Sequence, residues 1–262
     1  MVNSIKITLG ETGQTFLQSN KLPEKGTVDK QPAGLNFYEY SWNVRTPGQV
    51  VVNDKAYSFT IPYVLSITGT EDAAEIDQGI QKFSINAGIT ADDLIDHDKA
   101  RVEFSGFLQK LKNSGWKTVI AYEDPRLAGE DAFKYYLEDK FYSLPLDYIP
   151  TLDEWMKIKT GSWHLYAGSN FLDVTIRRDS QRVNISEPGA YLISFNLLTS
   201  TQKAKNQFDA EEIGHWQELW VDKIKSLKKE RYAKETELTQ RGFTIYTEYE
   251  EPKIHAADPV EP

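Results

Sequence analysis

The chain of 262 residues contains no cysteine. It therefore has no disulfide, no thiol nucleophile and no thiolate ligand for zinc or an iron–sulfur cluster. It also lacks a run of 18 apolar residues, so we expect no transmembrane helix. Residues 1–10 do not show the basic-then-apolar pattern of an export signal. These absences assign no compartment, because they fit both the cytosol and an exported protein whose signal has been removed.

Sequence motifs of the common enzyme classes are missing as well. There is no Gly-x-Ser-x-Gly nucleophile turn, no phosphate-binding Gly-x-x-x-x-Gly-Lys-Ser/Thr and no dinucleotide-binding Gly-x-Gly-x-x-Gly. The histidines are widely separated, and a Glu-x-x-His occurs once, at Glu212 and His215, where a di-iron bundle requires it twice. We therefore expect no catalytic residues, no metal and no cofactor.

The composition is that of a folded, acidic protein. Apolar residues make up 40% of the chain and aromatic residues 12%, which is ordinary for a globular domain. Lysine and arginine number 30 against 39 acidic residues, so the formal net charge is −9. This balance argues against nucleic acid as a partner, because phosphate neutralisation needs clustered cations. The length allows one large domain or two domains of roughly 100–130 residues.

The charges are unevenly placed along the chain. Residues 71–98 hold eight acids and one base, and residues 221–234 hold six bases and two acids. A solvated surface is the simpler explanation of each segment. The functional interpretation is that the acidic segment steers a basic protein partner through charge complementarity. The predicted partner contacts in this segment are Glu71, Asp72, Glu75 and Asp77.

Two pairs of similar segments indicate an internal duplication. Residues 115–125 and 242–252 share the order glycine, aromatic residue, five residues, then Tyr-Glu-acid-Pro. Residues 63–67 and 191–195 are also similar, and the two pairs have offsets of 127 and 128 residues. Chance is the alternative, since tyrosine, glutamate and proline are common at strand ends. The nearly constant offset favours a true repeat.

The predicted elements agree between the two halves: strands, one long helix, then one strand. We therefore expect an α+β fold of two similar units, each a mainly antiparallel sheet with one long helix packed on it. The expected parts are an N-terminal arm or loop (1–37), a first unit (38–125), a helical connector (126–161), a second unit (162–252) and a C-terminal tail (253–262).

Several segments resemble a known group of proteins. They are residues 65–80, 85–89, 124–127, 148–156 and 163–168. These segments resemble exported proteins and lipoproteins of Gram-negative bacteria that are carried beside type VI secretion effectors and regarded as their immunity proteins. The resemblance implies a periplasmic or membrane-tethered protein that neutralises a toxic enzyme by binding it. The chain has no cysteine for lipidation, so a membrane tether would lie outside this chain.

The sequence therefore favours a non-enzymatic protein-binding protein, an immunity protein whose partner is a secreted type VI toxin. Trp155 and Trp163 are predicted to line the rim of a cleft between the two units. The alternative is a carboxylate-using hydrolase with its site between the units. The paired acids at residues 123–124 and 250–251 would suit glycoside chemistry, although solvated acids are usual just before a proline at a strand end. A small-molecule-binding protein is a third interpretation.

Overall fold

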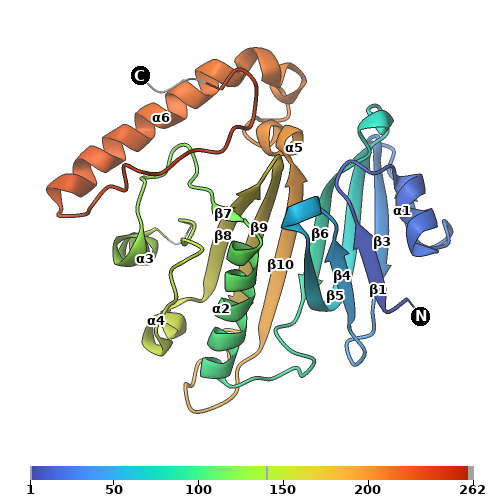
Figure 1. Cartoon of the computed structure of the whole chain (residues 1–262), viewed down its shortest axis with the longest axis horizontal. Coiled ribbons are helices and arrows are strands. Elements are labelled where there is room, and N and C mark those ends of the chain that lie inside the picture. Colours follow the sequence, from blue (N-terminus) through green and yellow to red (C-terminus); the bar gives the residue numbers. More distant parts are fainter. Residues whose placement is uncertain (1, 140, 259–262) are drawn as a thin grey trace.

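The computed structural model of the chain describes residues 2–139 and 141–258. Its centre is one sheet (Figure 1). The order of neighbouring strands is β1-β4-β5-β6-β10-β9-β8-β7. In addition, β3 pairs with β5, and β2 pairs with β3. The strands are β1 (Ser4–Ile7), β2 (Val28–Lys30), β3 (Leu35–Ser41), β4 (Gly48–Val52), β5 (Phe59–Asp72), β6 (Ile80–Ala87), β7 (Lys117–Thr118), β8 (Thr160–Ala167), β9 (Asn170–Arg178) and β10 (Tyr191–Thr199). The α+β class expected from the sequence is confirmed.

Helices connect the strands, and their starts follow from local sequence. At the start of α4, Thr151 accepts a hydrogen bond from the Glu154 backbone N–H while the Glu154 side chain accepts one from Thr151, which is a capping box. The helices are α1 (Gly13–Asn20), α2 (His97–Asn113), α3 (Gly129–Glu138), α4 (Leu152–Lys157), α5 (Ser200–Lys205) and α6 (Trp216–Gln240), and the 3-10 turns are η1 (Lys55–Tyr57), η2 (Ile76–Gln78) and η3 (Ile213–His215).

The 14-residue strand β5 organises one half of the sheet. β6 pairs with one side of it, and on the other side β4 and β3 pair end to end with successive parts of the strand. β1 then adds parallel to β4 at the edge. Asn20 of α1 closes this edge, because its side chain accepts from the Lys6 N–H and donates to the Lys6 carbonyl. A side-chain amide thus takes the place of a further strand.

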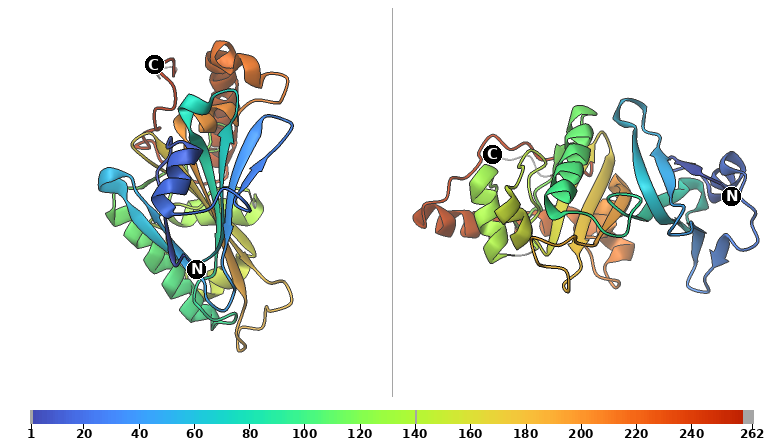
Figure 2. Two further views of the ribbon diagram at one scale, coloured as in Figure 1. Left: turned by 90° about the vertical axis from the view of Figure 1, so that its right-hand side faces the viewer. Right: turned by 90° about the horizontal axis from the view of Figure 1, so that it is seen from below.

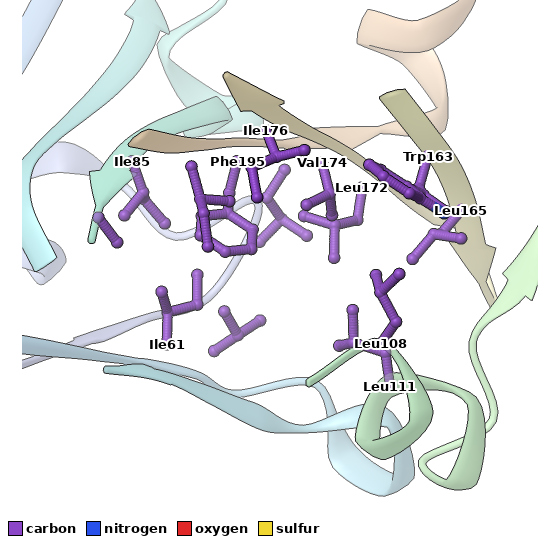
Figure 3. Packing of buried hydrophobic residues seen from close by; sticks show 14 of the residues in the cluster. Ile61, Ile85, Leu108, Leu111, Trp163, Leu165, Leu172, Val174, Ile176 and Phe195 are labelled. Carbon is purple, nitrogen blue, oxygen red and sulfur yellow. The ribbon is translucent and has the colours of Figure 1, made fainter. Parts of the chain in front are cut away.

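One face of the sheet, which we call the inner face, carries the main core. Trp163 of β8 packs against Phe104 of α2 with ring centroids 4.9 Å apart, and Trp155 of α4 packs against the same phenylalanine. Leu108 and Leu111 of α2 point toward the buried sheet residues (Figure 3). Figure 2 shows α2 lying along this side of the sheet. Each fully buried leucine contributes about 1.5–3 kcal/mol to stability.

The predicted duplication into two units is wrong. The described residues form one continuous sheet with one main core. Tyr63 lies in β5, the middle strand of the β4-β5-β6 meander, whereas Tyr191 begins β10, the last strand of the β8-β9-β10 meander. Helix α2 packs on the inner face, while α6 crosses beyond one end of the sheet (Figure 1). Gly115 and Gly242 share a φ near +90°, so the matching motif marks two helix ends.

The interpretation of residues 1–37 as an arm or loop is also wrong for the part that is described. This segment forms β1, α1, β2 and the start of β3. Ile5, Ile7 and Phe16 are fully buried in the main core. β1 has four residues and pairs with β4, which lies more than 40 residues further along the chain. So short a strand shows too few alternations to be recognised from sequence.

The connector and the tail also pack against the body. Residues 126–161 contain α3 and α4, as predicted, but these helices join the same core instead of linking two units. The tail is held as far as Asp258, whose carboxylate accepts a 2.7 Å hydrogen bond from the Trp220 indole. Residues 259–262 lie outside the described residues. The expected boundaries at 37, 125, 161 and 252 therefore divide a single body.

Candidate functional site

The face of the sheet opposite α2, which we call the outer face, is lined by short polar side chains. Alternate residues of a strand point to the same face, so the register aligns these side chains in rows across five strands. The first row is Ser66, Asn86, Ser194, Thr175 and Ser162, and the second row is Thr68, Ser84, Asn196, Asp173 and His164. All ten residues are half-buried.

Hydrogen bonds run along these rows from strand to strand. Ser194 Oγ donates to Asn86 Oδ1 at 2.8 Å, and Asn86 Nδ2 donates to Ser66 Oγ at 3.2 Å. In the second row Ser84 Oγ donates to Asn196 Oδ1 at 2.8 Å. These bonds fix the side chains across three strands. The result is an ordered surface of short, uncharged hydrogen-bonding groups.

Four titratable groups gather where the second row reaches β8 and β9. Asp173 faces His164 across the strand pair and accepts a 3.3 Å hydrogen bond from Lys203 of α5. Burial lowers the pKa of His164, against the opposing effect of Asp173, so the imidazole is neutral near pH 7. Glu123 lies close enough to influence the same pKa, and its Oε2 is buried without a hydrogen-bond partner. The second row is thus charged at both ends, since on β3 the exposed Glu39 pairs with Thr68.

Next to these four titratable groups, apolar residues and the C-terminal segment cover the outer face. Val119, Phe171 and Leu198 form a small apolar cluster there, and Ile254 of the C-terminal segment packs on it. Lys203 of α5 also lies over the Phe171 ring, at 5.9 Å from its centroid. The apolar cluster therefore lies beside the second row, on the same face of β9 and β10, with Lys203 of α5 and Ile254 of the C-terminal segment packed on it.

Glu71, the first predicted partner contact, is inside the protein. Its side chain is 1% exposed. Oε1 accepts from the Gly13 N–H at 2.8 Å, and Oε2 accepts from Tyr38 at 2.7 Å and from Asn36 at 3.3 Å. The prediction that Glu71 contacts a partner is therefore wrong. Alternation along β5 turns this carboxylate to the inner face, where it holds the start of α1.

The other three predicted acids remain near the surface, although the acidic segment is divided. Asp72 accepts from the Ala74 N–H, Glu75 forms a 2.6 Å ion pair with Lys205, and Asp77 is exposed. The acids of residues 92–98 lie beyond the other end of β6, whose eight residues span roughly 26 Å. The segment therefore forms two separate acidic areas. Its full charge is not presented on one surface.

Trp155 and Trp163, the predicted rim aromatics, are core residues. They are 2% and 1% exposed, respectively. The Trp155 indole donates a 3.0 Å hydrogen bond to the Tyr191 hydroxyl, and Trp163 packs on Phe104. The prediction that they line a cleft between two units is wrong, because both indoles are buried against the single sheet that the described residues form.

The basic stretch 221–234 is turned largely toward the protein body. Arg231 is fully buried and donates to Glu251 and to the Ala121 carbonyl. Lys228 forms a 2.6 Å ion pair with the same glutamate, and Lys234 lies 3.4 Å from Asp124. These contacts join α6 to the C-terminal segment and to the loop after β7. These contacts neutralise part of the positive charge of the stretch. We call the contacts of Lys228, Arg231 and Lys234 with Glu251, Ala121 and Asp124 the clamp on α6.

A pocket of about 460 Å³ between α6 and the C-terminal segment brings together acids and a histidine, as a hydrolase would require. Its titratable lining includes Glu250, Glu251, His255 and Asp258. Glu251 is already bound by two cations, and Asp258 accepts from Trp220 and from the Ile254 N–H. The two carboxylates are thus engaged in structural bonds. This arrangement gives little support to paired acid–base catalysis.

Within residues 2–139 and 141–258, no group of three or more histidine, aspartate or glutamate side chains is arranged to hold a metal ion. Across the same residues, no helix combines the length and the apolar character needed to cross a bilayer. Comparisons with protein-family models, with curated proteins and with solved structures each gave no match.

The polar rows were missed at the sequence level, although a signal was present. In β6, β9 and β10 polar residues alternate with large apolar ones, as in residues 83–86, 172–175 and 193–196. Such alternation predicts a strand with one buried and one solvated face. What the sequence did not show was the strand order, which places the polar positions of five strands side by side.

Proposed function

We propose that the protein binds another protein across its outer face and thereby neutralises it, as an immunity protein against a secreted type VI toxin. The outer face is the observation that carries the proposal: two hydrogen-bonded polar rows cross five strands on the side opposite α2. The sequence resemblance supplies the class of partner. No step of the proposal requires a catalytic residue or a cofactor.

The chemistry of the outer face favours a protein partner over a small molecule. Small ligands are held in concave, mostly apolar pockets with a few polar groups. The rows instead offer serine, threonine and asparagine side chains, and serine and asparagine are among the hydrogen-bonding residues enriched in the binding loops of antibodies. The short side chains lose little conformational entropy when they are covered.

The remaining acids have a secondary role in this proposal. Asp72 and Asp77 lie near the end of the sheet where η2 approaches α5 and are not neutralised by an ion pair of the described residues. They therefore supply the long-range attraction to a basic partner that was first assigned to the whole segment. In this role the protein works in the periplasm or at a membrane that faces it.

The test is a complex with the product of the neighbouring gene in the native host. The two purified proteins are mixed, and complex formation is measured by calorimetry together with the toxic activity of the neighbour. We expect a complex of defined stoichiometry in which that activity is lost. A neighbour that is toxic but neither binds nor is inhibited would contradict the proposal.

The hydrolase alternative is tested at the pocket beside α6. Glu250→Gln changes an exposed pocket carboxylate that forms no ion pair within the described residues, so the fold is expected to persist. If a hydrolytic activity were found in the wild-type protein and lost in this variant, the alternative would replace the binding proposal.

A further inference from the structure

Strand β5 holds one residue in a backbone conformation that is unusual for a strand. Tyr63 has a φ of +55°, in the left-handed region. A bulky side chain is strained there, because its Cβ crowds the backbone, whereas glycine adopts the same φ freely. Within residues 2–139 and 141–258 the other non-glycine residues with a positive φ are Lys21, directly after α1, and Lys55, the first residue of η1. Tyr63 instead lies inside a 14-residue strand.

The conformation of Tyr63 is imposed by the pairing of β5 with its two neighbours. Between the paired positions Ile61 and Val64, β5 has two residues where β4 has one, which is a β-bulge. On the other side, the Tyr63 carbonyl accepts a 3.0 Å hydrogen bond from the Gly88 N–H, directly after β6. Ile61 and Val64 both belong to the main core, whereas Pro62 is exposed and Tyr63 is half-buried. The bulge therefore leaves Pro62 and Tyr63 outside the core.

The fold makes little use of the Tyr63 side chain. Across the described ranges 2–139 and 141–258, its hydroxyl forms no hydrogen bond, its ring pairs with no other ring, and it packs on none of the three apolar clusters. A glycine would satisfy the same backbone without strain. Strained residues of this kind are concentrated at functional sites, where the surrounding structure enforces them. The ring is therefore better explained by binding than by folding.

Tyr63 lies beside the end of the first polar row of the outer face. Ser66, the β5 member of that row, is three residues further along the strand. Leu192 of β10 is two residues before Ser194 of the same row, so its side chain lies on the outer face, where it is 37% exposed. Gly88, which binds the Tyr63 carbonyl, continues β6 next to this leucine. A tyrosine and an exposed leucine thus border the polar row at this end.

We propose that Tyr63 is an anchor residue of the outer-face interface, with its ring inserted into an apolar pocket of the partner protein and Leu192 beside it in the contact. This inference rests on the proposed function, because it names a residue of that interface. Tyrosine is enriched among the residues that dominate binding energy, since it offers a large, rigid contact area. A ring presented from a fixed bulge is also pre-organised, so it loses little freedom on binding.

The test separates the ring from the backbone conformation. Tyr63→Gly and Tyr63→Asn both suit a left-handed φ, and both remove the ring. Each should keep or raise the melting temperature, because strain is relieved, while weakening the binding of the neighbouring gene's toxic product by at least about tenfold in calorimetry. Tyr63→Phe keeps the ring, so its affinity should stay within about threefold of that of the wild type.

Lys21→Gly is the matched control, since Lys21 has a φ of +54° and is exposed after α1. It should also keep or raise the melting temperature, but with unchanged affinity. If the wild-type protein does not bind the toxic neighbour, the proposed function fails and this inference fails with it. If the wild type binds and the Gly and Asn variants of Tyr63 bind equally well, only the anchor role is wrong. A melting temperature lowered by more than about 5 °C in both variants would assign the ring to the fold and would also overturn the inference.

Discussion

The Tyr38 hydroxyl donates a 2.7 Å hydrogen bond to Glu71 Oε2 beneath the start of α1. Glu71 also accepts from the Gly13 N–H, so one buried carboxylate joins β3, β5 and α1. Burial and this carboxylate both raise the pKa of Tyr38, which stays protonated and donates at any physiological pH. A residue predicted to contact a partner is thus part of the fold.

The first prediction concerns this carboxylate. Glu71→Gln replaces one acceptor oxygen with a donor that faces another donor, so it should lower the free energy of unfolding by about 2–3 kcal/mol. The neighbouring Asp72→Asn, at a half-buried position, should change it by less than about 0.5 kcal/mol. Urea unfolding of the three proteins measures both values. Equal effects of the two substitutions would contradict the structural role of Glu71.

The second prediction concerns the clamp on α6. Glu251→Gln leaves the fully buried Arg231 and the adjacent Lys228 without their shared carboxylate, so we expect a loss of about 3–5 kcal/mol. Hydrogen exchange should rise in α6 and in residues 249–258. Glu250→Gln, one residue away and exposed, is the matched control and should leave exchange unchanged. Unaltered protection of α6 in the Glu251 variant would show that other contacts hold the helix.

The third prediction is a pH dependence at Asp124. Burial raises the pKa of Asp124 from 3.8 to about 6, despite the nearby Lys234. The native state then binds more protons than the unfolded state between about pH 4 and 6, so Asp124 lowers stability as the pH rises through this window, by roughly 2 kcal/mol.

Asp124→Asn removes this titration, while its amide oxygen can still accept from Lys234. The stability of the variant relative to the wild type should therefore increase from pH 4 to pH 7. Asp77→Asn, at an exposed site, should show no such trend. Chemical unfolding at four pH values provides the comparison, and parallel curves for Asp124→Asn and the wild type would refute the shifted pKa.

The fourth prediction concerns Gly189, which bridges to Ile95 beside the buried His97. A Cβ at Gly189 would lie 2.4 Å from His97 Cε1. Gly189→Ala should therefore destabilise the protein by about 1–3 kcal/mol, because the imidazole is fixed by Tyr191 and by the Asn184 carbonyl. Gly106→Ala, where a Cβ meets nothing within 4 Å in the middle of α2, should instead stabilise by about 0.5–1 kcal/mol. Thermal unfolding distinguishes the two signs.

The sequence predicted those parts of the fold that depend on local pattern. Polar–apolar alternation is a local signal for β8, β9 and β10, and the capping pair Thr151 and Glu154 is a local signal for the start of α4, in the connector that was expected to be helical. The edge strand β1 was missed because its four residues become a strand only by pairing with β4. The predicted repeat failed because a glycine after a helix followed by an aromatic residue is a local solution to helix termination, used here at Gly115 and Gly242.

The candidate site was harder to predict because adjacency in sequence differs from adjacency in space. The acids of residues 71–98 are consecutive along the chain, yet β6 separates them into two areas and alternation buries Glu71. Conversely, Ser66 and Ser162 come from distant segments and share one row. Composition could not show this row, since it depends on the pairing of β6 with β10.

The most direct measurement of the central claim is the affinity of the partner for an outer-face variant. Thr175 lies inside the first row, and its hydroxyl lies 3.5 Å from the Ser162 hydroxyl. Thr175→Arg should therefore leave the fold intact while placing a long charged side chain across the row. Ser226→Arg on the exposed side of α6 is the matched control. If the account is correct, Thr175→Arg weakens binding of the toxic neighbour at least tenfold and Ser226→Arg does not; unchanged affinity in Thr175→Arg would contradict it.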